Sequence, residues 1–136
     1  MTATYSSPDD LAHPVPYHHV AVGTGSRHIH VAGQIGRSGA GTPMAPDDLT
    51  AQVAQALRNV HAGLRDAGAS FADVVRLTFY VVDWTADRMD AFMAGIADVA
   101  AEIDLPSPIP PASLIGVSVL FEPGVLVEVE ATAVAD

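Results

Sequence analysis

The chain contains no cysteine and no lysine, and each absence excludes a kind of chemistry. Without cysteine, neither a disulfide framework nor a thiolate metal site can form. Without lysine, Schiff-base catalysis and a lysine general base are excluded. The chain has six arginines and 16 acidic residues, so the formal net charge is -10. Because cations bind the phosphate backbone, this acidic surface disfavours a nucleic-acid partner.

Long apolar runs are also absent. No stretch approaches the roughly 18 consecutive apolar residues that cross a bilayer, and residues 1–13 lack the basic start and apolar stretch of a secretory signal. The expected compartment is therefore the cytoplasm, and no membrane partner is expected. The chain of 136 residues has the length of one domain. We expect a flexible N-terminal arm in residues 1–14, which show no periodicity, and a single domain in residues 15–136.

Hydrophobic periodicity predicts the element order β-β-α-β-α-β-β. The predicted elements are a hairpin (17–23 and 27–32) turning at Gly25, a mobile loop (36–46), a helix from Asp47 and Asp48 to Gly68, a central strand (73–82), a second helix (85–103) and two closing strands (113–121 and 125–134). The central strand is apolar on both faces, so we expect both to be covered. Two helices cannot cover both faces of such a sheet, and self-association is the expected solution.

The last predicted strand contains a carboxylate between two apolar residues. Glu128 lies between Val127 and Val129, and alternation places it on one face with Glu130, roughly 7 Å away. A carboxylate that loses water needs a partner or a function, so Glu128 is a candidate catalytic residue. The alternative is an ordinary solvated strand face.

Histidines gather in the predicted hairpin. His18 and His19 lie on its first strand, and His28 and His30 share a face of its second strand, so an imidazole cluster is conceivable. A metal site needs three or four converging ligands, and exposed or hydrogen-bonded histidines are commoner. We expect neither a metal nor a cofactor.

Several short motifs occur in an order that resembles the RidA/YjgF family, the reactive-intermediate deaminases also described as endoribonuclease L-PSP. The resemblance extends from about Val15 to the C-terminus. The motifs are Pro16-Tyr17, Ala32-Gly33-Gln34-Ile35, Gln55-Ala56-Leu57-Arg58-Asn59-Val60, Asp66-Ala67-Gly68-Ala69, Asp73-Val74-Val75 and Val127-Glu128-Val129-Glu130-Ala131.

This resemblance implies a chorismate-mutase-like subunit of the α+β class, with a mixed sheet and two helices on one face. It also implies a homotrimer whose sheets form a barrel with ligand clefts between neighbouring chains. In typical members, an arginine in a Pro-Ala-Arg-Ser motif binds the substrate carboxylate and a glutamate positions the attacking water. The reaction is hydrolysis of an enamine or imine, such as 2-aminoacrylate, to a 2-keto acid and ammonia. No cofactor is implied.

The resemblance also assigns residues. Glu128 matches the water-positioning glutamate. The matched ligand-binding positions are Tyr17, Gly33, Gln34 and Ser113.

Two positions depart from the family pattern: Ala112 replaces the arginine, and Ala32 replaces a serine. Losing a bidentate arginine weakens the binding of a small 2-imino acid. An apolar Ala112 also enlarges the cleft. His19, Arg88 and Arg37 are the candidates to replace the missing cation.

We therefore expect a divergent RidA-like protein that acts on a small imine or enamine other than 2-aminoacrylate, in clefts between subunits. The alternative is a trimer that binds a small metabolite without catalysis. Endoribonuclease activity is disfavoured by the acidic, lysine-free composition.

Overall fold

The computed structural model describes residues 2–39 and 45–136. Its elements are the strands β1 (Ala3–Ser6), β2 (Val20–Gly23), β3 (Arg27–Ile35), β4 (Val74–Val82), β5 (Ala112–Val117) and β6 (Val127–Ala135), the helices α1 (Leu49–Asp66) and α2 (Met89–Ala100), and the short 3-10 turns η1 (Phe71–Asp73) and η2 (Ala86–Arg88). The predicted order β-β-α-β-α-β-β is confirmed from β2 to β6, and β1 precedes it. Part of the predicted loop over 36–46 lies outside the described residues.

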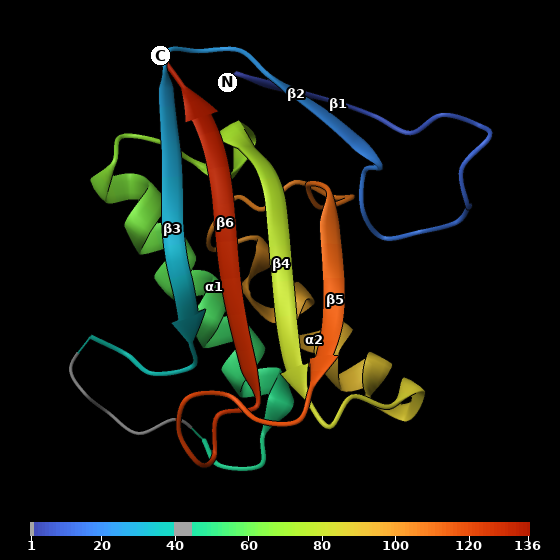
Figure 1. Cartoon of the computed structure of the whole chain (residues 1–136), viewed down its shortest axis with the longest axis vertical. Helices are drawn as coiled ribbons and strands as arrows, with labels where there is room; N and C mark the ends of the chain where they lie inside the picture. The colour runs from blue at the N-terminus through green and yellow to red at the C-terminus, as the bar shows by residue number, and fades with distance from the viewer. Residues whose placement is uncertain (1, 40–44) are drawn as a thin grey trace.

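Four strands form the main sheet, in the order β3-β6-β4-β5. β4 pairs with β5 in parallel, and β6 pairs antiparallel with both β3 and β4. Both helices pack against one face of this sheet, as Figure 1 shows. The predicted α+β class with two helices on a mixed sheet is confirmed. β3 and β5 are the two edges of this sheet.

Helix α1 follows from its cap and its apolar stripe. The Asp48 carboxylate accepts a hydrogen bond from the Ala51 amide at 2.9 Å and satisfies one of the free N–H groups of the first turn. Gly68 follows the helix with φ 73, a backbone conformation that glycine adopts without strain. The predicted helix is confirmed, with Asp48 as the N-cap. Its stripe packs into the core, whose large buried members are Val53, Leu57, Val60, Leu64, Leu77, Phe79, Val81, Phe92, Val127 and Val129.

The sheet face away from the helices, here called the open face, carries polar side chains. In β4, Leu77, Phe79 and Val81 are buried, whereas Arg76 is exposed. Glu128 and Glu130 of β6 alternate with the buried Val127 and Val129, so both glutamates lie on the open face. Within one chain, the open face of β4 is only partly covered: Thr78 is buried there, whereas Arg76 is exposed. The expectation that self-association covers this face stays a prediction.

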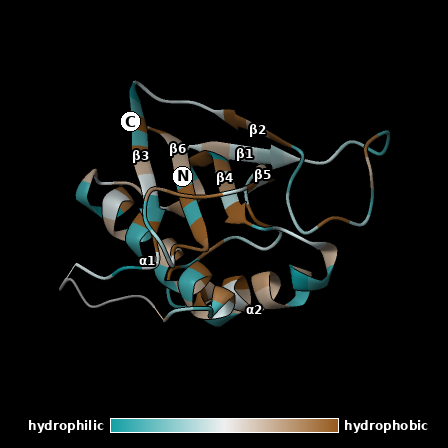
Figure 2. Ribbon diagram, turned by 60° about the horizontal axis from the view of Figure 1, so that its bottom comes forward, coloured by the Kyte–Doolittle hydropathy of each residue, from teal (hydrophilic) through white to brown (hydrophobic). Residues whose placement is uncertain are grey.

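The predicted hairpin is also wrong. β2 pairs with β1, and β3 pairs with β6. The β1–β2 pair lies on the side of the main sheet opposite the helices (Figure 2). A Cβ on Gly23 would be 2.9 Å from Val75 and 3.0 Å from Val134, so β2 packs directly on the open face.

Strand β1 (Ala3–Ser6) lies within residues 1–14, for which the sequence predicts a flexible arm. Its start is held by Asp73, which accepts hydrogen bonds from the Thr2 amide at 3.1 Å and the Thr2 hydroxyl at 2.9 Å. The Tyr5 hydroxyl donates to the Val74 carbonyl at 2.7 Å. Burial and the Asp73 charge raise the pKa of Tyr5 to about 12. β1 is therefore attached to the start of β4 by half-buried polar contacts.

The segment between the last two strands differs from the prediction as well. β5 ends at Val117, four residues earlier than expected, and a loop over residues 118–126 precedes β6. Phe121, expected in the strand, lies in this loop and is 73% exposed. In the described part of the chain, no helix has the length and apolar character that crossing a membrane requires.

Candidate functional site

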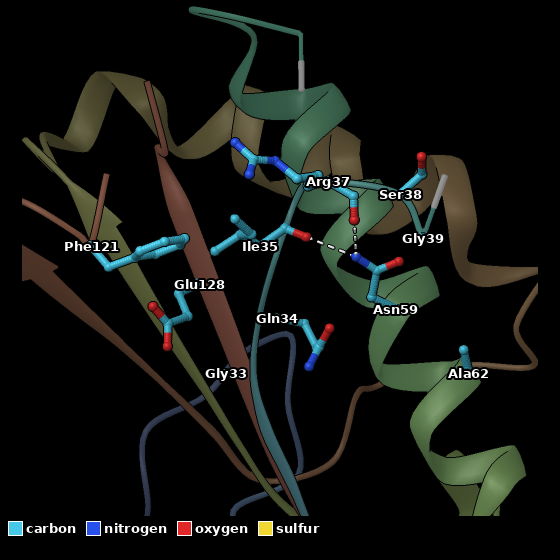
Figure 3. Close-up of a pocket in the computed structure, with 10 residues that line it drawn as sticks. All are labelled: Gly33, Gln34, Ile35, Arg37, Ser38, Gly39, Asn59, Ala62, Phe121 and Glu128. Atoms are coloured by element: carbon cyan, nitrogen blue, oxygen red, sulfur yellow. Dashed lines mark hydrogen bonds between the residues drawn. The ribbon is translucent and has the colours of Figure 1, made fainter. Parts of the chain in front are cut away.

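A cavity of about 670 Å³ lies beside the edge strand β3 and contains the Glu128 carboxylate. Figure 3 shows its lining: Gly33, Gln34, Ile35, Arg37, Ser38, Gly39, Asn59, Ala62, Phe121 and Glu128. These residues come from β3, the loop after it, α1, β6 and the loop before β6. Gly33, Gln34 and Glu128, which the sequence predicted as site residues, therefore meet in one place.

The Glu128 carboxylate lies directly over the backbone of Gly33. A Cβ on residue 33 would be 1.8 Å from Glu128 Oε1 and 2.6 Å from Cδ, distances that no real contact shows. The pairing of β3 with β6 is irregular between Val31 and Gln34, so this approach occurs at a β-bulge. Glycine at position 33 makes room for the half-buried carboxylate.

The loop after β3 is tied to helix α1 by Asn59. Asn59 Nδ2 donates to the carbonyls of Ile35 at 2.9 Å and Arg37 at 2.7 Å, and Gln55 Nε2 donates to Asn59 Oδ1 at 2.9 Å. These contacts fix the backbone of Arg37, whose guanidinium forms an ion pair with Glu122. Asn59 is a residue of this site that the sequence did not predict, although it stands in the helix motif of the family.

Gln52 holds the other loops near this cavity. Its side chain is 1% exposed. Nε2 donates to the carbonyls of Ala45 and Gly124 at 3.0 Å each, and Oε1 accepts from the Leu126 amide at 2.9 Å. All its polar atoms are thus partnered, as a buried amide requires. The sequence signal that could have identified Gln52 as a structural residue is its position next to the apolar stripe of α1.

A second, smaller cavity lies at the opposite sheet edge, beside β5. Its volume is about 130 Å³, and its lining is almost entirely apolar: Pro16, Tyr17, Phe79, Met89, Phe92, Met93, Ile96, Ile109, Ala112, Ser113 and Leu114. Three predicted ligand-binding residues, Tyr17, Ala112 and Ser113, therefore meet here. Arg76 Nη2 donates to Ser113 Oγ at 2.6 Å, a contact that the sequence analysis did not foresee.

His19 and Arg88, two candidates for the missing cation, line neither of these cavities. The His19 ring packs edge-on against Tyr17, with ring centres 5.3 Å apart. Its Nδ1 is buried without a hydrogen-bond partner in the described part of the chain. Arg88 Nη1 donates to the carbonyls of Val82 at 2.6 Å and Asp83 at 3.3 Å, which keeps it at the end of β4. Arg37 lines the cavity that contains Glu128.

The two groups of predicted site residues do not meet within one chain. Gly33 lies on edge strand β3 and Ala112 on edge strand β5, with β6 and β4 between them. Neighbouring strands are about 4.8 Å apart, so three spacings separate these edges by about 14 Å. A small ligand cannot touch both groups in one chain.

Glu130, on the same face as Glu128, has a different partner. It accepts a hydrogen bond from the Tyr80 hydroxyl at 2.9 Å. This hydrogen bond is the main reason that the pKa of Tyr80 lies above its ordinary value of 10.0, and partial burial adds to it. Glu130 therefore has a hydrogen-bonding role, and the Glu128 carboxylate is the one facing the cavity.

The histidines do not form the conceivable cluster across a hairpin. His18 stacks on Tyr5 with ring centres 4.8 Å apart, and His19 packs edge-on against His13 with ring centres 5.4 Å apart. His28 and His30 lie on β3, which is not paired with β2. Among residues 2–39 and 45–136, no three histidine, aspartate or glutamate side chains are grouped as a metal site requires.

Comparisons with known proteins agree with this fold. A family model described as Endoribonuclease L-PSP matches residues 8–135. The chain is similar to YyfB, a Rid-family protein from Yersinia pestis, with 34% identity, 98% of this chain and 99% of that chain covered, and a TM-score of 0.85. It is also similar to the YjgF gene product of E. coli, with 29% identity, coverage of 82% and 83%, and a TM-score of 0.69.

A third similar structure is E. coli TdcF with bound serine, at 25% identity, with 100% of this chain and 98% of that chain covered and a TM-score of 0.68. No curated protein matches. The match over nearly the whole length, together with the order of the strands, identifies the family. The chain belongs to the RidA/YjgF family, whose family model carries the description Endoribonuclease L-PSP.

Proposed function

We propose that this protein hydrolyses the C=N bond of a small imine, or of the enamine in equilibrium with it, to a 2-oxo acid and ammonia. The observation that carries the proposal is the half-buried Glu128 carboxylate, which faces a cavity of about 670 Å³ and lies over Gly33. A carboxylate held at a cavity wall can accept a proton from water and return it to a leaving group.

The proposed steps need only water and this carboxylate. Glu128 takes a proton from water while the water oxygen forms a bond to the imine carbon. The C=N electron pair moves to nitrogen, which takes a proton from a second water molecule and leaves a hydroxide ion. Glu128 then delivers its proton to the amino group of this carbinolamine. The C–N bond breaks with its electron pair on nitrogen, the hydroxyl oxygen forms the C=O bond and gives its proton to the hydroxide ion, and ammonia leaves. No oxidant or cofactor enters the balance.

The ligand site is proposed to lie between two copies of the chain. The cavity at β3 supplies Glu128, and the cavity at β5 supplies Tyr17, Ala112 and Ser113; about 14 Å separates the two edges in one chain. Placing the β5 edge of one copy beside the β3 edge of the next brings both groups to one ligand. Because the two edges differ, such contacts are head-to-tail, and they form a ring when the rotation between copies closes. A homotrimer is the proposed assembly.

Exposed apolar side chains support this assembly. Ile115 on the open face is 43% exposed, and Val119 and Phe121, in the loop before β6, are 74% and 73% exposed. Val119 and Phe121 line one surface pocket, and exposed apolar side chains grouped in this way favour a protein interface. Phe121 also lines the Glu128 cavity, so an interface there would enclose the proposed site.

The substrate is proposed to have an apolar side chain larger than that of 2-aminoacrylate. The cavity next to Ala112 has a volume of about 130 Å³ and is lined by Phe92, Met89 and Met93 among others. A dry apolar cavity of about 150 Å³ holds a molecule of benzene size, so the space beside Ala112 fits a group of a few carbons. The serine bound to TdcF supports a ligand of amino-acid type.

An RNA substrate is disfavoured in spite of the family description. The formal net charge is -10, and Arg37 is the one arginine among the described residues that line the two cavities. RNA binding depends on cationic contacts to phosphates.

The experiment measures imine hydrolysis directly. An L-amino-acid oxidase generates the imine of leucine, and semicarbazide traps what remains, so an active hydrolase lowers semicarbazone formation. We expect the wild type to compete with semicarbazide and Glu128→Gln to lose about 100-fold in rate, the size of a general acid–base contribution.

Glu102→Gln is the matched control, because Glu102 is an exposed glutamate that pairs with Arg58 on the outside of the helices. It removes the same charge and should leave the rate unchanged. A wild-type rate no higher than that of Glu128→Gln would contradict hydrolysis and leave ligand binding as the function.

A further inference from the structure

A cationic side chain already lies in the cavity that contains Glu128. The chain has six arginines, and their contacts differ. Arg27 donates to the Asp136 and Ala67 carbonyls, Arg58 pairs with Glu102, Arg76 binds Ser113 and Arg88 binds carbonyls at the end of β4. Arg65 lies exposed in the last turn of α1. Arg37 lines the cavity together with Glu128, Gln34 and Asn59.

The backbone around Arg37 is fixed by helix α1. Asn59 Nδ2 donates to the Arg37 carbonyl at 2.7 Å and to the Ile35 carbonyl at 2.9 Å. Gly36 is buried against the same helix, since a Cβ there would be 2.8 Å from the Gln52 Cα. Figure 3 shows Asn59 bonded to both carbonyls at the cavity wall. A guanidinium on such a backbone is preorganised for binding, which lowers the ordering cost.

The partner of Arg37 is a carboxylate that can be exchanged. The Arg37 and Glu122 side chains are 41% and 27% exposed, and Glu122 comes from the loop before β6. An ion pair at a surface contributes little to stability because water screens both charges. A carboxylate of a ligand offers the guanidinium the same geometry, with two parallel hydrogen bonds.

We propose that Arg37 binds the substrate carboxylate in place of the arginine that is missing at position 112, and that Glu122 occupies Arg37 until the substrate displaces it. This inference rests on the proposed function and adds its specificity: the substrate is a monocarboxylate, and its anionic end lies at the β3 edge beside Glu128. Glu122 is then a competitor whose removal strengthens substrate binding.

The test uses 2-oxobutyrate as the probe and its neutral amide, 2-oxobutanamide, as the matched uncharged ligand. Binding to the full-length assembled protein is measured by calorimetry for the wild type, Arg37→Gln, Glu122→Gln and Arg58→Gln. Arg58→Gln removes an arginine from a comparable exposed ion pair on the outer helix surface, and it controls for net charge. Thermal unfolding of each variant confirms that it is folded.

We expect Arg37→Gln to weaken 2-oxobutyrate binding about tenfold to 100-fold, the range that one charge-assisted contact provides. Glu122→Gln should strengthen 2-oxobutyrate binding, and neither change should alter the much weaker binding of the amide. Arg58→Gln should match the wild type. Equal 2-oxobutyrate affinity in Arg37→Gln and Arg58→Gln would overturn the inference, as would a wild type that binds acid and amide alike.

The same variants separate this inference from the proposed function. Imine hydrolysis that depends on Glu128 but is unaffected by Arg37→Gln would leave the function standing and refute the role of Arg37. Binding of 2-oxobutyrate that depends on Arg37, in a protein without imine hydrolysis, would support Arg37 and refute the reaction.

Discussion

The Glu128 carboxylate and the backbone of Gly33 are so close that any side chain on residue 33 would displace the carboxylate. The closest distance, from a Cβ on residue 33 to Glu128 Oε1, would be 1.8 Å. Gly33 is therefore a positioning residue for Glu128. The cavity wall accommodates the carboxylate only because this strand position has no side chain.

Gly33→Ala should reduce imine hydrolysis about 100-fold, close to the effect of Glu128→Gln, because both remove the carboxylate from its place. The assay is competition with semicarbazide for the leucine-derived imine. Gly39→Ala is the control, since Gly39 lines the same cavity and a Cβ there would have no neighbour within 4 Å. A Gly33→Ala enzyme as active as Gly39→Ala would contradict the assigned role of Gly33.

Position 112 should control substrate size. Ala112→Arg fills the cavity of about 130 Å³ and adds a cation. We expect its kcat/KM to fall for the leucine-derived imine and to rise for 2-aminoacrylate, because the new guanidinium binds the carboxylate of the smaller substrate. Ala112→Leu separates charge from volume: it should lose the larger substrate without gaining the smaller one. A parallel change for both substrates in Ala112→Arg would argue against an apolar subsite here.

Gln52 should contribute to the stability of the loops before α1 and β6. Gln52→Leu leaves the Leu126 amide and the carbonyls of Ala45 and Gly124 without this partner, and the free energy of unfolding should fall by about 1 to 3 kcal/mol. Urea denaturation measures the change. Gln55→Leu, which removes one hydrogen bond to Asn59 at 2.9 Å, should cost less. The reverse ranking would show that the Gln52 contacts do not hold these loops.

Asp73 should make the free energy of unfolding depend on pH in the acidic range. Burial alone would raise its pKa, but the hydrogen bonds from Ser70 and Thr2 outweigh this effect and hold the pKa below its ordinary value of 3.8. A lowered pKa means that the folded state favours the carboxylate. The resulting stabilisation is complete above pH 3.8 and is lost as the pH falls through the lower pKa of the folded state.

Asp73→Asn should therefore be less stable than the wild type at neutral pH, and its stability should fall less as the solution is acidified toward pH 3.8 and below. Denaturant midpoints measured across this range give the comparison. Asp98→Asn, an exposed change on α2, should keep the wild-type acid dependence. A wild type and an Asp73→Asn variant that lose stability in parallel would rule out this contribution of Asp73.

Local patterns predicted much of the fold. Asp48 and the apolar stripe from Leu49 onward predicted α1, because capping and amphipathic periodicity depend only on neighbours in sequence. Alternation likewise placed Glu128 opposite Val127 and Val129. The family motifs assigned Gly33, Gln34 and Glu128 to one ligand site, and all three line the same cavity in the structure.

The failed hairpin has a specific physical reason. In the sequence, Gly25 has the pattern of a turn residue between two paired strands, but glycine is needed there for another contact: a Cβ at position 25 would be 2.4 Å from the Ala135 carbonyl oxygen at the end of β6. A close approach between residues 25 and 135 leaves no local pattern. The sequence alone could not distinguish it from a hairpin turn.

Contacts between distant residues also determined the parts of the site that were missed. The Arg37–Glu122 pair joins residues 85 positions apart, and Gln52 contacts Leu126 across 74 positions. Neither pairing has a periodic signal. The division of the site residues between two sheet edges likewise follows from the strand order β3-β6-β4-β5, which places β6 next to β3.

A mixed-oligomer experiment tests the shared site most directly. Glu128→Gln disables the β3 half of each proposed site, and Ala112→Trp blocks the β5 half, so each variant alone should be inactive toward the leucine-derived imine. Co-assembly of equal amounts should restore about one quarter of the wild-type activity. In a randomly mixed ring, about half of the copies carry an intact Glu128 and about half of their neighbours carry an intact Ala112, so about one quarter of the shared sites are complete. Activity of the mixed oligomers no higher than that of the two parents would contradict a site shared between chains.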